Sequence, residues 1–182
     1  ISGYNRKSLL SRFNAGESVV PDRIFRDIYE HAYDIYEITG GVVDAASAPL
    51  FDIWGFGFAN DSLPSDEKVA QVMAASGMKL LSRDFPDSGD NRPKLNFNAI
   101  AQGYSCDLVA EYLYSIGVKD MMVDIGEIFC DGRNPSGQPW SLGIDKPVDG
   151  NNEPGAQIQG VFRAPEGPHG IVTSGNYRKF YI

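Results

Sequence analysis

Residues 117–130 read GVKDMMVDIGEIFC and mark the point where helix-like spacing gives way to strand-like spacing. Beyond Lys119, short apolar runs alternate with turn residues, a pattern typical of strands. The expected strands cover Met121–Ile125, Ile128–Cys130, Trp140–Ile144, Ile158–Phe162 and Ile171–Thr173. Turns such as Asp131-Gly132 and Asp149-Gly150 favour antiparallel pairing of these strands.

Ahead of this point the sequence predicts helices. Apolar side chains recur every three or four positions in residues 21–39, with Pro21 and Asp22 in the first turn and Gly40-Gly41 as the stop signal. The apolar stripe of this helix comprises Ile24, Phe25, Ile28, Tyr29, Ala32, Ile35 and Tyr36.

Two further helices are expected. One has Ser65 as its N-cap, ends before Gly77 and buries Val69, Val72 and Met73. The other follows a solvated loop at 82–94 and ends at Gly117. Its predicted buried stripe comprises Tyr104, Leu108, Tyr112, Leu113 and Ile116.

Helices followed by a meandering sheet predict an α+β fold, with helices packed on one face of a largely antiparallel sheet. A length of 182 residues suits a single domain. The net charge of −8 disfavours binding to nucleic acid or anionic membranes. Cys106 and Cys130 lack metal-ligand spacing and are expected to be buried thiols.

Residues 40–57 combine a glycine pair, Asp44 and the rings of Trp54 and Phe56. Glycine allows close approach of a ligand, and the rings offer flat surfaces, so a flat aromatic ligand is one interpretation. The alternative is core packing, which is the more common role of such rings. Asp44 can equally serve as the N-cap of a short following helix.

Residues 96–104 join an extended segment to the third helix through small side chains. The unpaired amides at a helix start suit a diphosphate. The alternative is a packed junction in which Asn98 caps the helix. His31 and His169 have no serine or cysteine arrangement around them, so solvated or core positions are expected for both.

Four segments, taken in order, resemble the ApbE family of FAD:protein FMN transferases. They are the Tyr-Asn and Ser-Arg-Phe-Asn elements at 4–14, Thr-Gly-Gly to Trp-Gly-Phe-Gly at 39–57, Ala-Ile-Ala-Gln-Gly-Tyr at 99–104 and Thr-Ser-Gly-Asn-Tyr-Arg at 173–178. The resemblance implies an ApbE-type, T-fold-like domain over residues 1–182 that lacks the family's N-terminal segment and its C-terminal metal-binding segment.

The resemblance also implies a chemistry. FAD is the donor, Mg²⁺ the metal, and a Ser or Thr hydroxyl of a target flavoprotein the acceptor, with AMP as the leaving group. Residues at FAD-contacting positions of the family are Tyr4, Val42, Val43, Asp44, Asn96 and Gln102. Ala99 stands where the family offers a main-chain oxygen to the metal.

Departures from the family pattern shape this expectation. Asn96 stands where many members have Asp, so it cannot act as a base but can still form hydrogen bonds. One glycine, Gly126, stands where two are usual. Alternatives to the transferase are hydrolysis of FAD to FMN and AMP, or a non-catalytic FAD-binding lipoprotein. The resemblance further implies an exported protein, periplasmic or anchored to the membrane by a lipid outside this chain.

Overall fold

The structure, a computed structural model, describes residues 1–55, 63–85, 92–151 and 153–175. The chain forms two compact units, Ile1–Ala101 and Gln102–Ile182. The boundary between them along the sequence falls inside the helix Asn98–Ser115. The expectation of a single domain stays a prediction. Phe56 and residues 176–178, which the sequence singled out, lie outside the described residues.

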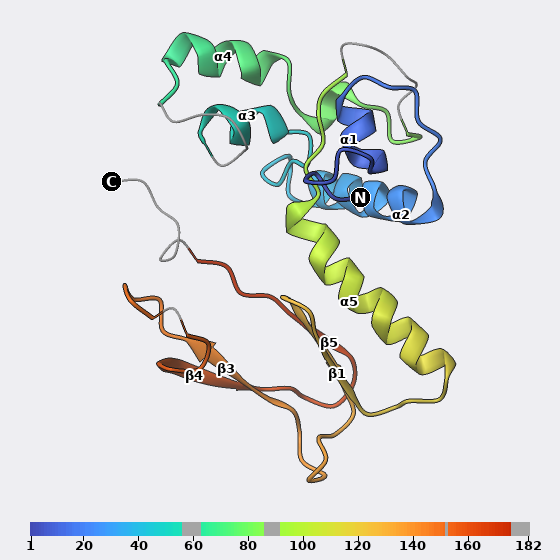
Figure 1. The fold of residues 1–182 in the computed structure, drawn as a ribbon, viewed down its shortest axis with the longest axis vertical. Helices are drawn as coiled ribbons and strands as arrows, with labels where there is room; N and C mark the ends of the chain where they lie inside the picture. Colours follow the sequence, from blue (N-terminus) through green and yellow to red (C-terminus); the bar gives the residue numbers. More distant parts are fainter. Residues whose placement is uncertain (56–62, 86–91, 152, 176–182) are drawn as a thin grey trace. The chain divides into compact units, whose positions relative to one another are not determined.

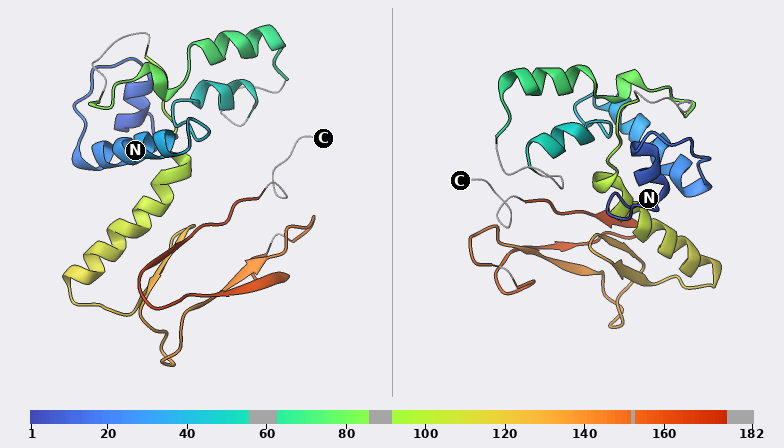
Figure 2. Two further views of the ribbon diagram at one scale, coloured as in Figure 1. Left: turned by 180° about the vertical axis from the view of Figure 1, so that it is seen from behind. Right: turned by 45° about the horizontal axis from the view of Figure 1, so that its top comes forward.

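The N-terminal unit is helical (Figure 1). Its elements are α1 (Leu9–Asn14), α2 (Arg23–Ile38), α3 (Ala48–Ile53), α4 (Asp66–Ala74), the short 3₁₀ helix η1 (Met78–Leu80) and the start of α5 (Asn98–Ser115). In both views of Figure 2, α3 and α4 lie side by side. The expected helices at 21–39 and 65–77 are therefore confirmed, with α1 and α3 added.

The start of α2 differs by two residues from the prediction. Asp22 is the N-cap, and its carboxylate accepts a hydrogen bond from the Phe25 amide at 2.8 Å. Pro21 therefore precedes the helix instead of occupying its first turn. Phe25, Ile28, Tyr29 and Ala32 are buried as expected.

Aromatic rings form the core of the N-terminal unit. Phe25 packs edge-on against Phe97 at 5.4 Å between ring centroids and contacts Phe13 at 6.0 Å. Phe85 joins the same cluster through Phe25, at 5.4 Å. The loop after residue 82 was expected to be solvated, and this is wrong at Phe85, because its ring completes the aromatic core.

Two buried-face predictions for helices are also wrong. Met73 of α4 is exposed, and no residue of α4 is fully buried. In α5 the fully buried residues are Cys106 and Ala110, whereas Tyr112 and Ile116 are exposed. Small side chains thus occupy the packed face of α5, where the hydrophobic pattern favoured large ones.

The C-terminal unit contains the strands, all paired antiparallel (Figure 1). They are β1 (Met121–Asp124), β2 (Ile128–Asp131), β3 (Ser141–Asp145), β4 (Ile158–Arg163) and β5 (His169–Ile171). Among the described residues they make two sheets, β1-β2-β5 and β3-β4, instead of one. The α+β class and the antiparallel pairing are confirmed, and the last strand ends at Ile171 instead of Thr173.

Packing within this unit explains why these strands pair. Cys130, Leu142 and Ala164 are buried together, and Trp140 packs against them. The indole Nε1 of Trp140 donates to the Asp131 carbonyl at 2.9 Å. Part of α5 covers the first sheet, because the Tyr114 ring stacks edge-on against Phe129. No described helix is long and apolar enough to span a bilayer.

Candidate functional site

The glycine-rich loop after α2 is held by the end of that helix. Gly41 donates to the Tyr36 carbonyl at 2.8 Å, which places the loop across the last turn. The Val42 amide donates to the Thr39 carbonyl at 3.4 Å, and the Val43 amide to Thr39 Oγ1 at 3.2 Å. The two valine amides are therefore occupied within the protein.

The exposed side chains of Val42 and Val43 give this loop an apolar surface. Val42 is 86% exposed and Val43 42% exposed. With their amides already bonded, these residues can accept hydrogen bonds from a ligand but not donate them. The loop therefore suits ring N–H or hydroxyl groups of a ligand better than its phosphates.

Asp44 is turned toward the protein. Its Oδ1 accepts hydrogen bonds from the Ala46 amide at 2.8 Å and the Met78 amide at 3.0 Å. The N-cap alternative is wrong, because Ser47 is the N-cap residue of α3. The Asp44 carboxylate instead joins its own turn to Met78, the first residue of η1.

Asn96 lies beside this turn and leads into α5. Its amide donates to the Ala45 carbonyl at 2.7 Å. Its side-chain Oδ1 accepts from the Asn98 amide at 2.8 Å. Asn98 is thus the first residue of α5, and the Asn96 side chain satisfies its amide. Because Oδ1 is used in this way, the Nδ2 group is the part of the side chain left to donate to a ligand.

Ala99 lies exposed in the first turn of α5. One carbonyl oxygen is not a metal site, since Mg²⁺ takes near-octahedral oxygen coordination. The described residues include no cluster of three His, Cys, Asp or Glu side chains that could hold a metal. The Ala99 carbonyl would therefore need further oxygen ligands to form a magnesium site.

Gln102 belongs to the C-terminal unit. Its Nε2 donates to the Ile125 carbonyl at 3.0 Å, in the turn between β1 and β2. The next residue, Gly126, has φ +105°, and a Cβ there would overlap the Gln102 amide. The single glycine at this turn is thus required by both its backbone conformation and Gln102.

The predicted site residues therefore fall into groups. The structure brings together Val42, Val43, Asp44 and Asn96 through the Ala45–Asn96 hydrogen bond. Tyr4 is 71% exposed near the start of the same unit. Trp54 is partly exposed at the end of α3, and His31 is exposed as expected.

Sequence reasoning missed two contributors to this site. No sequence-based prediction gives a role to Asn14 of Ser-Arg-Phe-Asn or singles out Met78. Asn14 contacts Leu95, and Met78 contacts Asp44. Both contacts join segments far apart in sequence, so no local pattern could have revealed them.

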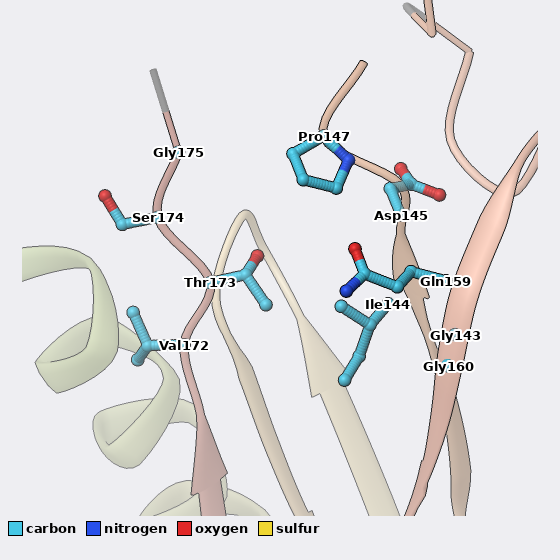
Figure 3. A pocket seen from close by; sticks show the side chains of 10 residues that line it. All are labelled: Gly143, Ile144, Asp145, Pro147, Gln159, Gly160, Val172, Thr173, Ser174 and Gly175. Carbon is cyan, nitrogen blue, oxygen red and sulfur yellow. The ribbon is translucent and has the colours of Figure 1, made fainter. Parts of the chain in front are cut away.

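The C-terminal unit holds a cavity of about 740 Å³. Its lining residues, shown in Figure 3, are Gly143, Ile144, Asp145, Pro147, Gln159, Gly160, Val172, Thr173, Ser174 and Gly175. The Thr173 side chain points toward Ile144 and Gln159, whereas Val172 points away (Figure 3). None of these lining residues, all of which belong to the described part of the chain, carries a basic side chain.

Comparisons with known proteins identify the family and the fold of the chain. A family model described as the ApbE family matches residues 1–182. The chain is 33% identical to a *Vibrio cholerae* protein named FAD:protein FMN transferase, covering 100% of this chain and 55% of that protein. It is 30% identical to a *Salmonella typhimurium* protein of the same name, covering 100% of this chain and 53% of the relative. The chain thus spans about half the length of these relatives.

Solved structures give the same result for the fold. The flavin transferase ApbE from *Vibrio cholerae* superposes with a TM-score of 0.79 at 30% identity, covering 100% of this chain and 60% of that one. The apo flavinyl transferase ApbE from *Pseudomonas stutzeri* gives 0.70 at 32% identity, covering 80% of this chain and 48% of that one. Together with the family match over residues 1–182, these likenesses show that the chain belongs to the ApbE family.

Proposed function

We propose that the protein, in its full natural length, transfers FMN from FAD to a Ser or Thr hydroxyl of a target flavoprotein and releases AMP. The observation that carries this proposal is the Asn96–Ala45 hydrogen bond. It joins Ala45, which directly follows residues 42–44, to the segment 96–99, and by resemblance both segments correspond to FAD-contacting and metal-contacting positions in the family. Relatives named FAD:protein FMN transferase align over the whole chain.

The reaction is a displacement at phosphorus. The target hydroxyl oxygen forms a bond to the phosphorus on the FMN side of the diphosphate, the bridging P–O bond breaks, and AMP takes the electron pair. The hydroxyl proton passes to solvent or to a base. Mg²⁺, when bound, would neutralise charge on the diphosphate, with the Ala99 carbonyl as one ligand beside others outside the described residues.

The described residues have binding and orienting roles. The carbonyls of Val42 and Val43 would accept hydrogen bonds from FAD, and Asn96 Nδ2 would donate to it. The start of α5 carries a partial positive charge, which favours an anionic group nearby. Asn96 cannot take up the hydroxyl proton, since a neutral amide is not a base.

The direct test is incubation of the full-length protein with FAD, Mg²⁺ and a candidate flavoprotein domain. The expected result is covalent flavin fluorescence on the target in a denaturing gel, with one AMP released per label. A target whose acceptor Thr is replaced by Val is the control. Absence of label on every candidate target would contradict the proposal.

The same experiment separates the alternatives. Free FMN and AMP released without a target would identify FAD hydrolysis. Stoichiometric FAD retained unchanged, with or without Mg²⁺, would identify a binding protein. A second test compares FAD affinity of the wild type with that of Asp44→Ala. We expect weaker binding by the variant, and equal affinity would contradict a role for this loop in FAD binding.

Export to the periplasm, with a lipid anchor outside this chain, is part of the proposal. It rests on the family resemblance, since the targets of such a transferase are expected outside the cytoplasm. Protease added to intact spheroplasts should digest an exported protein, while a cytoplasmic marker survives. Survival of the protein in intact spheroplasts would contradict export.

A further inference from the structure

We propose that Asn14 and Asp44 are positioning residues that hold the FAD-binding edge of the N-terminal unit from two sides. This inference rests on the proposed function, in which Asn96 and residues 42–43 contact FAD. It assigns a role to the Ser-Arg-Phe-Asn element, which the proposed chemistry leaves unused. Neither side chain needs to touch FAD for this role.

Asn14 holds the residue next to Asn96 through two hydrogen bonds. Its Nδ2 donates to the Leu95 carbonyl at 2.8 Å, and its Oδ1 accepts from the Leu95 amide at 2.8 Å. A side-chain amide that bonds both main-chain groups of one residue fixes that peptide as a neighbouring strand would. Asn14 therefore sets the position of the chain entering Asn96.

The other side of Asn96 is held by the turn around Asp44. The Asn96 amide donates to the Ala45 carbonyl, and the Gly77 amide donates to the Ala46 carbonyl at 3.1 Å. The Asp44 carboxylate bonds the amides of Ala46 and Met78 at the same place. We refer to the contacts of Asn14 with Leu95 and of Asp44 with Ala46 and Met78, together with the Ala45–Asn96 bond, as the Asn14–Asp44 clamp.

Side-chain packing fixes which way Asn96 faces. Leu95 and Phe97 on either side of it are each 1% exposed, and Phe97 packs against Phe25. Asn96 is half-buried between them, so its side chain lies on the opposite side of the segment. Leu95 and Phe97 thus fix the rotation of residues 95–97 about the direction of the chain. The Asn14–Asp44 clamp prevents the same segment from sliding along that direction.

Asn14→Asp tests the clamp with almost no change in shape. A carboxylate can accept from the Leu95 amide but cannot donate to the Leu95 carbonyl, so one of two hydrogen bonds becomes a repulsion. We expect the dissociation constant for FAD, measured by flavin fluorescence, to rise at least about tenfold. We expect the KM for FAD to rise with it, while kcat at saturating FAD stays near that of the wild type.

A stability control separates positioning from general unfolding. Ile28→Val removes one methyl group from the core of the same unit without touching the clamp. At a temperature where both variants are fully folded, Ile28→Val should bind FAD as the wild type does. Amide hydrogen exchange at Leu95 should accelerate in Asn14→Asp but not in Ile28→Val.

The outcomes separate this inference from the proposed function. If the wild type binds FAD and Asn14→Asp binds it equally well, the inference is wrong and the proposed function stands. If Asn14→Asp and Ile28→Val weaken binding equally, Asn14 is only a stabilising residue and the inference is again wrong. If the full-length wild type binds no FAD, both the inference and the proposed function are overturned.

Discussion

The Asp44 carboxylate accepts a hydrogen bond from the Met78 amide at 3.0 Å, across 34 residues of sequence. This contact joins the turn after the glycine pair to the first residue of η1. It also changes the role that we infer for Asp44, which the family resemblance marks as an FAD contact. The carboxylate is already bonded to two amides, so its effect on FAD would come through the shape of the loop.

Asp44→Ala should therefore destabilise the protein even without FAD. The change leaves the buried amides of Ala46 and Met78 without their acceptor, which should cost about 2–3 kcal/mol. Chemical denaturation with urea measures this difference. Asp52→Ala, at an exposed carboxylate on α3, is the control and should change stability by less than about 0.5 kcal/mol. Equal effects of the two substitutions would contradict the role given to Asp44.

Gly77→Ala should also destabilise the protein. Gly77 has φ +112°, and a Cβ there would lie 3.1 Å from Asp44 Oδ2. Backbone strain and this close contact together should cost about 1–3 kcal/mol in thermal or urea unfolding. Gly137→Ala is the matched control, because Gly137 also has a positive φ but open space around it. A cost at Gly77 no larger than at Gly137 would show that the contact with Asp44 adds nothing.

Ser76→Ala should stabilise the protein. Ser76 is 4% exposed, and its Oγ has no hydrogen-bond partner among the described residues. Removing a buried hydroxyl without a partner should gain about 1 kcal/mol in the free energy of unfolding. Ser47→Ala is the opposite case, because Ser47 Oγ donates to the Asp44 carbonyl at 2.6 Å, and it should lose stability. Loss of stability in Ser76→Ala would contradict the interpretation that the buried Ser76 hydroxyl destabilises the protein.

Gly126 and Gln102 should be energetically coupled. Gly126→Ala forces its Cβ into the Gln102 amide, so Gln102 must leave the Ile125 carbonyl. In the Gln102→Ala background the overlap is absent, and only the strain of the positive φ remains. The cost of Gly126→Ala should therefore fall by about 1 kcal/mol in that background. Additive costs in the double-mutant cycle would show that the two positions are independent.

The Tyr114 hydroxyl should lose its proton at a higher pH than an ordinary tyrosine. Its hydroxyl donates to Asp131 Oδ2 at 2.5 Å, and this hydrogen bond to a carboxylate raises the pKa of Tyr114 to about 12. The raised pKa means that the neutral phenol stabilises the fold fully below pH ~10, and that this stabilisation is lost as pH rises through about 12. The absorbance difference between wild type and Tyr114→Phe should show this late midpoint. Asp131→Asn should move it down toward pH ~10.

The order of helices and strands could be predicted because it depends on the spacing of apolar residues along the chain. The stripe of α2 and the short apolar runs around β1 and β2 need no distant partner to be recognised. The packed face of α5 could not be predicted in this way. Its buried residues are the small Cys106 and Ala110. The Cys106 thiol approaches the Glu127 carbonyl to 3.0 Å, a contact that the sequence does not reveal.

The candidate site could also be predicted only in part. Family motifs indicated Asp44 and Asn96, but not that the Ala45 carbonyl joins them. The direction of the Asp44 carboxylate also depends on Met78, which carries no recognisable motif. Side-chain identity can be read from a sequence, whereas the choice of main-chain partner depends on how distant segments meet.

The contact between Asn14 and Leu95 also sets an order of events during synthesis, because 81 residues separate them. α2 needs only neighbouring residues and can form as soon as it leaves the ribosome. Asn14 must wait until Leu95 emerges, and the Phe25 ring must wait for Phe97. A nascent chain that stops short of these residues exposes an aromatic surface suited to chaperones. The N-terminal unit should therefore become protease-resistant only after Phe97 has been translated.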